Sequence, residues 1–314
     1  MKSVFIDGSA GTTGLRIYER LEKRDDIDLI ILDDEHRKDP ASIKDAIYRS
    51  DITFLCLPDA AAIEAVELAE GSNAVIIDTS TAHRTNDDWA YGFPELNKDQ
   101  RKKIASSKRI ANPGCYATGF ISIAAPLVKS GMISADFPVS AFALSGYSGA
   151  GKKAIEVYEG PAKPADFNAP REYALSQQHK HIPEMQKLSG LTRKPLFSPV
   201  VDDYYSGMFV SVPFYTDMMK GVKGPDDVRE MFEAYYKGEK LIKVMSKGAE
   251  DEYSGFISAN LLAGRDSLEL FVTGNEERIV VTTRFDNLGK GASGAAIQNM
   301  NIVMGADELS GLVP

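Results

Sequence analysis

The sequence predicts an α/β protein in which a parallel sheet covered by helices is followed by a second domain of the α+β class. Three observations support this fold class. Short β-rich apolar runs alternate with amphipathic segments through the first hundred residues. Beyond residue 135 the apolar runs become longer and more varied. Residues 289–305 then return to a helical pattern rich in small side chains. The length of 314 residues is enough for two domains.

The first strand-like run begins almost at the N-terminus. We expect strands at residues 3–8, 28–34, 52–58 and 74–80, separated by helices at residues 14–24, 41–50 and 60–71. This alternation is typical of parallel strands joined by crossover helices that cover both faces of a sheet. Ligands of such sheets bind at the edge where the strands have their carboxyl ends.

The second half of the chain predicts a mostly antiparallel or mixed sheet. Its strand-like runs lie at residues 138–149, 207–215, 268–274 and 278–286. We expect the last helix to pack back on the first domain, which would make that domain discontinuous. The expected domains are therefore residues 1–114 with 288–314, and residues 115–287.

Composition excludes several classes of partner. The net charge of −9 and the pI of about 5.1 argue against nucleic acid and against an anionic membrane surface, because both require a clustered basic face. No apolar run approaches the length of a membrane span, and the N-terminus reads as a strand instead of a signal peptide. Cys56 lies in a strand-like run, so we expect no disulfide with Cys115 and a reduced, cytoplasmic protein.

A glycine-rich stretch, GSAGTTG, separates the first expected strand from the first expected helix. This is the place where a dinucleotide-binding fold brings its backbone against a pyrophosphate, and the spacing G-x-x-G-x-x-G is a variant of the usual fingerprint. The candidate cofactor-binding residues here are Gly8, Ser9, Gly11, Thr12, Thr13 and Gly14. We expect the second strand to end at Asp33 and Asp34, about 20 residues on, where an acid binds a ribose. Arg37 just beyond could accept a 2′-phosphate, so the acids favour NAD and the cation favours NADP; a solvated loop is the alternative for Arg37.

The stretch NPGCYATG places Cys115 between a Pro-Gly turn and an apolar helical segment. Unsatisfied N–H groups and the positive end of the helix dipole favour the thiolate over the thiol at such a position. We therefore predict that Cys115 is a nucleophile, in preference to a small apolar side chain that fills a packing gap. Cys56, within its strand, fits the packing role.

A thiolate nucleophile needs an acid or base partner, and His179 and His181 are the candidates. They precede Pro183 and Glu184, which read as the first turn of a helix. A histidine at a helix N-terminus is biased toward the neutral imidazole of a base. The alternating H-K-H also resembles a metal-binding strand, but no compact set of further ligands is apparent, so no metal site is predicted.

Two further stretches have the residue types of an anion site. Residues 144–154, LSGYSGAGKKA, form a loop whose backbone N–H groups could hold a phosphate or carboxylate, with Lys152 and Lys153 in the same loop. Arg84 follows the fourth expected strand, where a guanidinium could bind a carboxylate or phosphate. The alternative for Arg84 is a surface salt bridge.

Taken together, these stretches resemble the N-acetyl-gamma-glutamyl-phosphate reductases, and especially their shorter subclass. The matching motifs run in the family's order over nearly the whole chain: GSAGTTG, IDTSTAHR, YGFPEL, NPGCYATG, SGYSGAGKK, HKHIPEM and DNLGKGASGAAIQNMN. The motifs around Cys115 and at residues 290–301 are the most specific. The sequence departs from the longer subclass at two places. STAHR stands where those enzymes commonly carry Asp-Phe-Arg, and Val200 and Val201 stand where those enzymes tend to carry a histidine.

The resemblance implies a Rossmann-type domain and a second domain like that of glyceraldehyde-phosphate dehydrogenase. It also implies reduction of N-acetyl-L-glutamyl 5-phosphate by NADPH, in arginine biosynthesis, by a homo-oligomeric enzyme (dimer or tetramer). Cys115 maps onto the family's nucleophile and His181 onto its acid/base, with His179 the alternative. Asn287 maps onto the residue that holds the nicotinamide carboxamide. The implied substrate-binding residues are Arg84, Ser145, Gly146, Ser148, Gly149 and His179.

Three other functions are weighed against this one. A sister dehydrogenase would take another acyl phosphate, such as aspartyl phosphate. A cysteine hydrolase or acyltransferase would use Cys115 and His181 without a cofactor, and would leave the glycine stretch and the alternating N-terminal half unexplained. A dinucleotide-binding sensor would behave the same with serine in place of Cys115.

Overall fold

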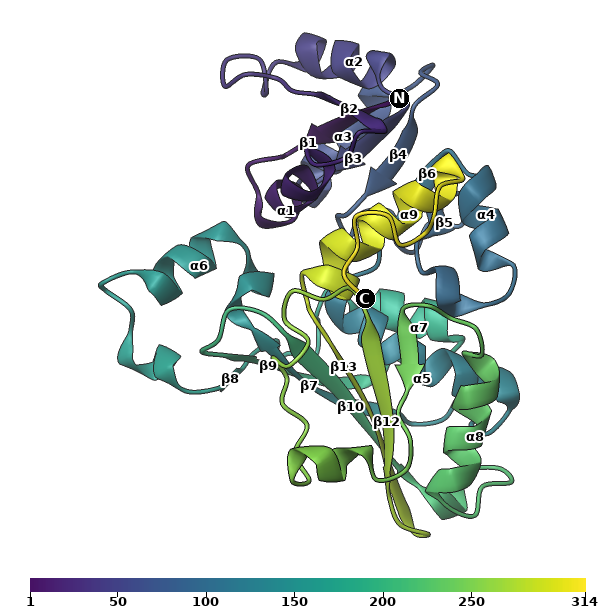
Figure 1. Cartoon of the computed structure of the whole chain (residues 1–314). Coiled ribbons are helices and arrows are strands. Elements are labelled where there is room, and N and C mark those ends of the chain that lie inside the picture. Colours follow the sequence, from purple (N-terminus) through teal and green to yellow (C-terminus); the bar gives the residue numbers. More distant parts are fainter. The chain divides into compact units, whose positions relative to one another are not determined.

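The computed structural model describes all 314 residues and divides the chain into two compact units (Figure 1). Unit 1 contains Met1–Gly114 and Ala292–Val313, so it is discontinuous in sequence. Unit 2 contains Cys115–Gly291 together with Pro314. This division leaves residues 288–291 with unit 2.

Unit 1 is built on a six-stranded sheet whose neighbouring strands are all parallel, as the sequence predicts. Along the sheet the order is β2-β1-β3-β4-β6-β5. The strands are β1 (Lys2–Asp7), β2 (Ile27–Ile30), β3 (Ile52–Leu55), β4 (Val75–Asp78), β5 (Ala90–Tyr91) and β6 (Arg109–Ala111). The order reverses at β1, between β2 and β3, which is the arrangement that places ligands at the carboxyl ends of the strands.

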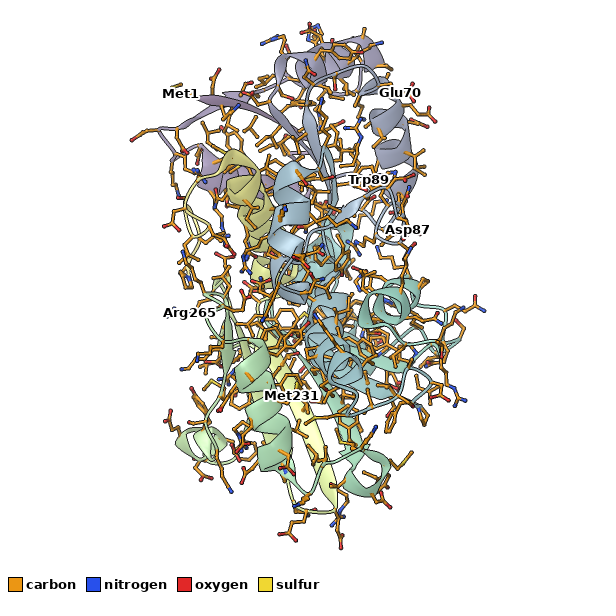
Figure 2. All side chains as sticks on the ribbon, turned by 90° about the vertical axis from the view of Figure 1, so that its right-hand side faces the viewer. Met1, Glu70, Asp87, Trp89, Met231 and Arg265 are labelled. Atoms are coloured by element: carbon orange, nitrogen blue, oxygen red, sulfur yellow. The ribbon has the colours of Figure 1, made fainter.

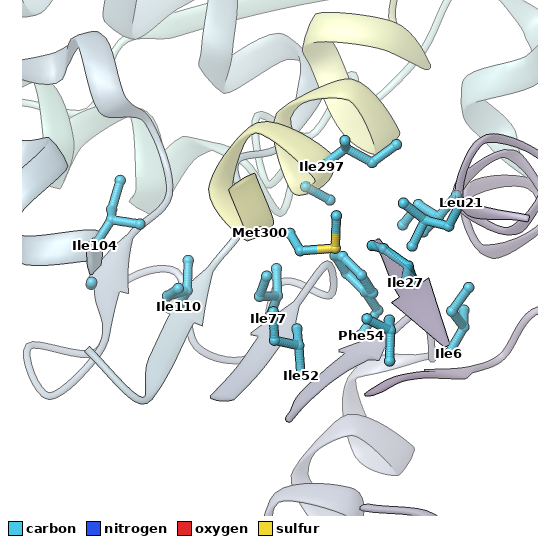
Figure 3. Close-up of a cluster of buried hydrophobic side chains, with 14 residues drawn as sticks. Ile6, Leu21, Ile27, Ile52, Phe54, Ile77, Ile104, Ile110, Ile297 and Met300 are labelled. Atoms are coloured by element: carbon cyan, nitrogen blue, oxygen red, sulfur yellow. The ribbon is translucent and has the colours of Figure 1, made fainter. Parts of the chain in front are cut away.

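Helices pack on both faces of this sheet. They are α1 (Thr12–Leu21), α2 (Pro40–Arg49), α3 (Asp59–Leu68), α4 (Gln100–Ser106), α9 (Gly294–Met304) and the short 3₁₀ turn η1 (Pro94–Leu96). One apolar cluster joins alternate strand residues to α1, α4 and α9; in Figure 3, Ile297 and Met300 of α9 lie over Phe54 and Ile77 of the sheet. A second cluster joins the opposite face of the sheet to α2 and α3.

Unit 2 is built on a seven-stranded mixed sheet of order β11-β12-β13-β10-β7-β9-β8. Its strands are β7 (Ser140–Gly146), β8 (Arg171–Glu172), β9 (Leu196–Asp202), β10 (Met208–Tyr215), β11 (Ile242–Val244), β12 (Leu268–Gly274) and β13 (Arg278–Phe285). β10 pairs antiparallel with β7 and β13, and β12 with β13, whereas β7 pairs parallel with β9 and β11 with β12. The predicted mixed sheet is therefore confirmed.

The helices of unit 2 are α5 (Cys115–Ser130), α6 (Lys152–Glu159), α7 (Ile182–Ser189) and α8 (Pro225–Tyr235). α5 packs against β10 and β13 and is buried from Tyr116 to Leu127, while α7 and α8 pack beside it. Five of the remaining turns are helical: η2 (Tyr147–Ala150), η3 (Ala165–Asn168), η4 (Thr216–Met218), η5 (Ala249–Tyr253) and the π-helical turn η6 (Gly289–Ser293), which leads into α9.

Two expectations about element bounds are wrong. The second strand ends at Ile30, not at Asp34, because the Asp33 carboxylate accepts the backbone N–H groups of Glu35 and His36 and so stabilises a turn there. Lys152 and Lys153 begin helix α6 and do not lie in a loop. Gly151, with φ of 85°, makes the sharp entry that lets this helix start so early.

Candidate active site

The glycine stretch forms a tight backbone turn after β1. Gly8 has φ of 83°, and a Cβ there would overlap the carbonyl oxygen of Cys56 on the neighbouring strand connection. A Cβ at Gly14 would overlap the carbonyl oxygen of Gly8, and the Gly11 N–H donates to that same oxygen at 3.0 Å. Backbone therefore occupies the space where side chains would lie, and the turn can approach a ligand closely.

The N-terminus of α1 has no side-chain cap. Gly11 is its N-cap residue and offers no side chain to accept the first N–H groups, and the first turn carries no acidic residue. Thr12 and Thr13 begin the helix and are half-buried. Free N–H donors at the positive end of a helix dipole attract a phosphate group. The structure brings Gly8, Ser9, Gly11, Thr12, Thr13 and Gly14 together in this turn, and the cradle fits a dinucleotide pyrophosphate.

Asp7 ends β1 immediately before this turn and is 6% exposed. Burial raises the pKa of its carboxyl group from 3.8 to about 6, against a smaller opposite effect of the Gly8 backbone hydrogen bond. No sequence motif singles out this residue.

Arg37 lies in the turn after β2, and its Nε is 2.8 Å from a carboxylate oxygen of Asp34. Both side chains are exposed. In the same turn, Nδ1 of His36 lies 2.7 Å from the Asp33 carboxylate, and backbone and side-chain hydrogen bonds from His36 lower the pKa of Asp33. The acids and the cation thus lie together at the carboxyl end of β2. Their role toward a cofactor stays a prediction.

Arg84 is buried and binds backbone carbonyl groups, so the alternative of a surface salt bridge is wrong. Its Nε donates to the carbonyl oxygen of Asn112 at 2.9 Å, and one terminal nitrogen donates to that of Thr79 at 2.8 Å. These carbonyls lie just past the ends of β6 and β4. Arg84 therefore fixes the segment that leads to Gly114, and contact with a substrate stays a prediction.

A buried histidine that sequence reasoning left unassigned lies beside Arg84. Nδ1 of His83 lies 2.7 Å from the carboxylate of Asp78, which ends β4, and its ring stacks on Trp89 at a centroid distance of 4.0 Å. Trp89 is labelled in Figure 2. The Asp78 carboxylate also accepts the backbone N–H and hydroxyl of Ser80. These hydrogen bonds thus anchor the STAHR segment to the end of β4. In the sequence, an aspartate five residues before a histidine is only a weak signal that the two side chains pair.

Cys115 is the first residue of α5 and remains partly exposed, whereas the helix beyond it is buried. The first turn of a helix stabilises negative charge, which suits a thiolate. Cys56 differs: burial raises the pKa of its thiol to about 12, which keeps it protonated and unreactive. The two cysteines form no disulfide.

A cluster of aromatic and histidine rings surrounds Tyr116, the residue after Cys115. The ring centroids of His179, His181 and Phe197 lie 5.7, 6.0 and 5.2 Å from that of Tyr116, respectively. The Tyr173 hydroxyl donates to the Tyr116 hydroxyl at 3.0 Å. Burial raises the pKa of both tyrosines, so their hydroxyl groups stay neutral. Sequence reasoning missed both, although Tyr116 adjoins the cysteine.

The two histidines of HKHIPEM have different partners. Nδ1 of His179 accepts the backbone N–H of His181 at 3.1 Å, and the rings are nearly perpendicular with centroids 4.7 Å apart. That bond uses one ring nitrogen of His179 to hold the backbone. His181 is the N-cap residue of α7 and is 5% exposed, with Pro183 and Glu184 in the first turn that follows.

Asn287 organises the small-residue segment at the end of β7. Its side-chain nitrogen donates to the Ser148 hydroxyl at 3.0 Å, and its oxygen accepts the backbone N–H of Gly207 at 2.8 Å. A Cβ at Gly149 would lie 3.2 Å from the same side-chain nitrogen. The structure thus brings Ser145, Gly146, Ser148, Gly149 and Asn287 together, with Asn287 buried beneath the loop. Its contact with a nicotinamide stays a prediction.

No group of three or more His, Cys, Asp or Glu side chains is arranged to bind a metal ion. No helix of the protein is long and apolar enough to cross a membrane.

Comparisons with known proteins bear on the family and the fold of this chain. The family model described as "Semialdehyde dehydrogenase, NAD binding domain" matches residues 3–104, and "Semialdehyde dehydrogenase, dimerisation domain" matches residues 115–287. Proteins called N-acetyl-gamma-glutamyl-phosphate reductase from Brucella ovis and Brucella melitensis are each 44% identical over 307 residues, covering 96% of this chain and 98% of theirs.

Solved structures show the same fold at lower identity. An aspartate semialdehyde dehydrogenase II from Vibrio cholerae has a TM-score of 0.73 at 16% identity, covering 97% of this chain and 98% of that one. The aspartate semialdehyde dehydrogenase from Francisella tularensis has a TM-score of 0.74 at 15% identity, covering 97% and 100%. At these identities the likeness concerns the fold alone.

Proposed function

Because this chain belongs to the N-acetyl-gamma-glutamyl-phosphate reductases of the semialdehyde dehydrogenase family, we propose that it reduces N-acetyl-L-glutamyl 5-phosphate with NADPH. The products are N-acetyl-L-glutamate 5-semialdehyde and phosphate, in arginine biosynthesis. The observation that carries the proposal is the position of Cys115, at the first turn of α5 and next to the cluster of Tyr116, His179 and His181.

Unit 1 supplies the residues for the two phosphate-bearing parts of the cofactor, whereas Asn287 belongs to unit 2. The open N-terminus of α1 and the turn from Gly8 to Gly14 bind the pyrophosphate through backbone N–H groups. Arg37, exposed and already paired with an acid, binds the 2′-phosphate that distinguishes NADPH from NADH. Asn287 supports the nicotinamide end. When bound, NADPH supplies the hydride for the reduction.

The Cys115 thiolate attacks the acyl carbon of the substrate. A carbon–sulfur bond forms and the carbon–oxygen bond to phosphate breaks, which releases phosphate and leaves a thioester on the enzyme. The backbone N–H of Cys115 stabilises the oxygen that becomes negative. After hydride transfer to the thioester carbon, the carbon–sulfur bond breaks, so the aldehyde leaves and the thiolate is restored.

His181 is the group that moves the proton. It donates to the oxygen that gains negative charge during reduction and takes the proton back as the aldehyde forms, a role worth about 10²–10⁴ in rate. The structure favours His181 over His179 for this role, because Nδ1 of His179 holds the backbone N–H of His181. His179 then orients the residue that acts.

The substrate lies against the small-residue segment of unit 2. Backbone N–H groups and hydroxyls from Ser145 to Gly149 contact its polar groups, with Asn287 holding Ser148 in place from below. Arg84, through its bonds to the carbonyl groups of Asn112 and Thr79, contributes by fixing the backbone of unit 1 that leads to Cys115.

The working enzyme is a homo-oligomer that associates through the sheet of unit 2. Helices cover one face of this sheet, and the other face exposes Phe142 (44%) and Tyr215 (62%), with the Phe142 and Phe209 rings 6.0 Å apart. An apolar sheet face of this kind is stabilised by burial against a second copy. We place the enzyme in the cytoplasm, where its thiol nucleophile stays reduced.

Two rival functions remain testable. Reduction of aspartyl phosphate is suggested by the names of the solved structures, but those share only 15–16% of residues with this chain. A cofactor-free cysteine hydrolase would have no use for the open N-terminus of α1.

A reverse assay tests the proposal. The enzyme is incubated with NADP⁺, phosphate and N-acetyl-L-glutamate 5-semialdehyde, and the absorbance of NADPH is followed. We expect NADPH to form with this substrate and not with aspartate semialdehyde, and to form only when phosphate is present. NADPH formation with aspartate semialdehyde alone would overturn the substrate assignment, and no formation with either would overturn the reductase assignment.

A further inference from the structure

Apart from its last residue, Pro314, the chain crosses between its two units at two places. One crossing is at Cys115 in the sequence, and the other is at a residue that contacts Cys115. The first crossing runs from Gly114 to Cys115, and the return crossing runs from Gly291 to Ala292. Cys115 is thus the first residue of unit 2 and Gly291 the last before the return. Within unit 2 these two residues are in contact.

Gly291 packs directly against Cys115. A Cβ at position 291 would lie 2.9 Å from Cβ and 3.3 Å from Cα of Cys115. Those atoms belong to the base of the side chain and to the backbone, so they cannot rotate away. Either Cys115 or the return crossing would have to move.

Space is the reason for glycine at this position. Gly291 does not have the positive φ that other glycines of this chain adopt, so its backbone conformation suits any residue. Its backbone is also fixed independently of the thiol, because its N–H donates to the carbonyl oxygen of Asp286 at 3.0 Å. The Asp286 carboxylate in turn accepts the backbone N–H groups of Gly264 and Leu288.

On the unit 1 side, Asn112 joins the same two crossings. It lies three residues before Cys115, is 1% exposed, and donates from its side-chain nitrogen to the carbonyl oxygen of Ala292 at 3.0 Å. Its side-chain oxygen accepts from Asn299 of α9 at 3.2 Å. Its backbone N–H donates to the carbonyl of Asp78, and its own carbonyl accepts from Arg84.

We propose that Gly291 and Asn112 are positioning residues for Cys115, which together hold the outgoing and returning crossings of the chain so that the sulfur stays in one place. The proposal rests on Cys115 being the nucleophile. Gly291 supplies the surface against which the base of the cysteine side chain rests. Asn112 ties the segment before Cys115 to the residue after Gly291. Placement of a nucleophile within a fraction of an ångström decides its reactivity, and a shift of about 1 Å costs about 10²-fold in rate.

The test measures the thiol itself, without substrate or cofactor. The rate of Cys115 alkylation by iodoacetamide is followed by peptide mass analysis across pH 5–10, a range chosen to be about the titration range of a thiol. We expect Gly291→Ala to lower the rate of Cys115 alkylation at neutral pH by about 10-fold or more, either at every pH or through a shift of the pH profile. kcat should fall by a similar factor, with the KM for NADPH changed less than about 2-fold.

Gly274→Ala is the matched control. Gly274 lies in the β12–β13 hairpin of the same unit, has φ of 120°, and an added Cβ would overlap the Arg278 carbonyl oxygen. This variant should lose stability and keep the alkylation rate of Cys115. If Gly291→Ala behaves like Gly274→Ala, Gly291 is a packing residue only and the proposal is wrong for it.

Asn112→Asp provides a second route if Gly291→Ala does not fold. The change keeps the shape and the oxygen that accepts from Asn299, but it replaces the donor to Ala292 with an acceptor. We expect alkylation to slow by about 10-fold. An unchanged alkylation rate in this variant would overturn the role of Asn112. Failure of the reductase assignment would appear differently, as a wild-type enzyme whose Cys115 is alkylated normally but which gives no turnover.

Discussion

Two helix N-termini in this protein follow parallel strands of the same sheet, and they are built in opposite ways. α1 follows β1 through Gly8–Gly11, and α5 follows β6 through Asn112–Gly114. The start of α1 is made of backbone, has no side-chain cap and is open to a ligand. The start of α5 carries a thiol, and the helix beyond it is buried.

Under the proposed function, the difference follows from where the negative charge comes from. At α1 the charge belongs to a ligand that arrives and leaves, so the protein needs unoccupied N–H donors and no Cβ atoms in the way. At α5 the charge develops on the protein's own sulfur, so the side chain must be fixed by its neighbours before any substrate binds. Under that proposal, one arrangement of strand, turn and helix serves binding at α1 and chemistry at α5.

The largest expected effect is near α5, where substitution of His181 and of His179 should lower kcat to different extents. His181→Gln should lower kcat by about 10²–10⁴, because the proton donor is lost. His179→Gln should cost less, since a glutamine side-chain oxygen still accepts the backbone N–H of His181. Steady-state kinetics of both variants check this, and a larger loss for His179→Gln would reverse the assignment.

A smaller effect is expected at the binding side. Gly8→Ala places a Cβ against the Cys56 carbonyl oxygen and forces a residue with a side chain to adopt φ of 83°. Strain of this kind costs about 1–3 kcal/mol, so the affinity for NADPH should fall by about 10-fold or more.

Fluorescence titration with NADPH measures that affinity. The alkylation rate of Cys115 in the same variant serves as the control and should not change. A Gly8→Ala variant that binds NADPH normally would show that the turn after β1 does not contact the pyrophosphate.

The smallest effect concerns Asp7, which begins the turn and has its pKa raised to about 6 by burial. A raised pKa means that the folded state holds the proton more tightly than the unfolded chain. The associated stability is fully present below pH 3.8 and is lost as the pH rises through 6. Relative to wild type, Asp7→Asn should therefore gain stability between about pH 4 and pH 7, by about 3 kcal/mol at most.

Urea unfolding followed by tryptophan fluorescence measures this difference, since the single tryptophan, Trp89, lies in unit 1. A stability difference between Asp7→Asn and wild type that does not change with pH would show that Asp7 does not titrate in this range.

Much of the fold is predictable because its signals are local. Strands of four to eight apolar residues between helices of period 3.6 predict the parallel sheet of unit 1 and the strands β10, β12 and β13 of unit 2. The end of β2 is not predictable in this way, because the apolar run continues past Ile30 and a side-chain hydrogen bond of Asp33 decides where the turn begins.

The sequence predicts a site residue when its role follows from its position at a turn or a helix start. It predicts less well a role that depends on contacts with residues far away in the sequence. A glycine turn before a helix and a cysteine at a helix start are visible in the sequence. The contact of Gly291 with Cys115, and the bond from Asn112 to Ala292, join residues more than 150 positions apart. Arg84 shows the same limit: its partners are backbone carbonyls, which no residue pattern reveals.

The proposed function depends above all on Cys115 carrying the substrate's acyl group, which peptide mass spectrometry can detect. The enzyme is mixed with N-acetyl-L-glutamyl 5-phosphate in the absence of NADPH, quenched in acid and digested. We expect a mass increase of one N-acetylglutamyl group on the peptide containing Cys115, its loss when NADPH is added before the quench, and none in Cys115→Ser. Release of phosphate with no acyl group on Cys115 would show that the reaction does not pass through this thiol.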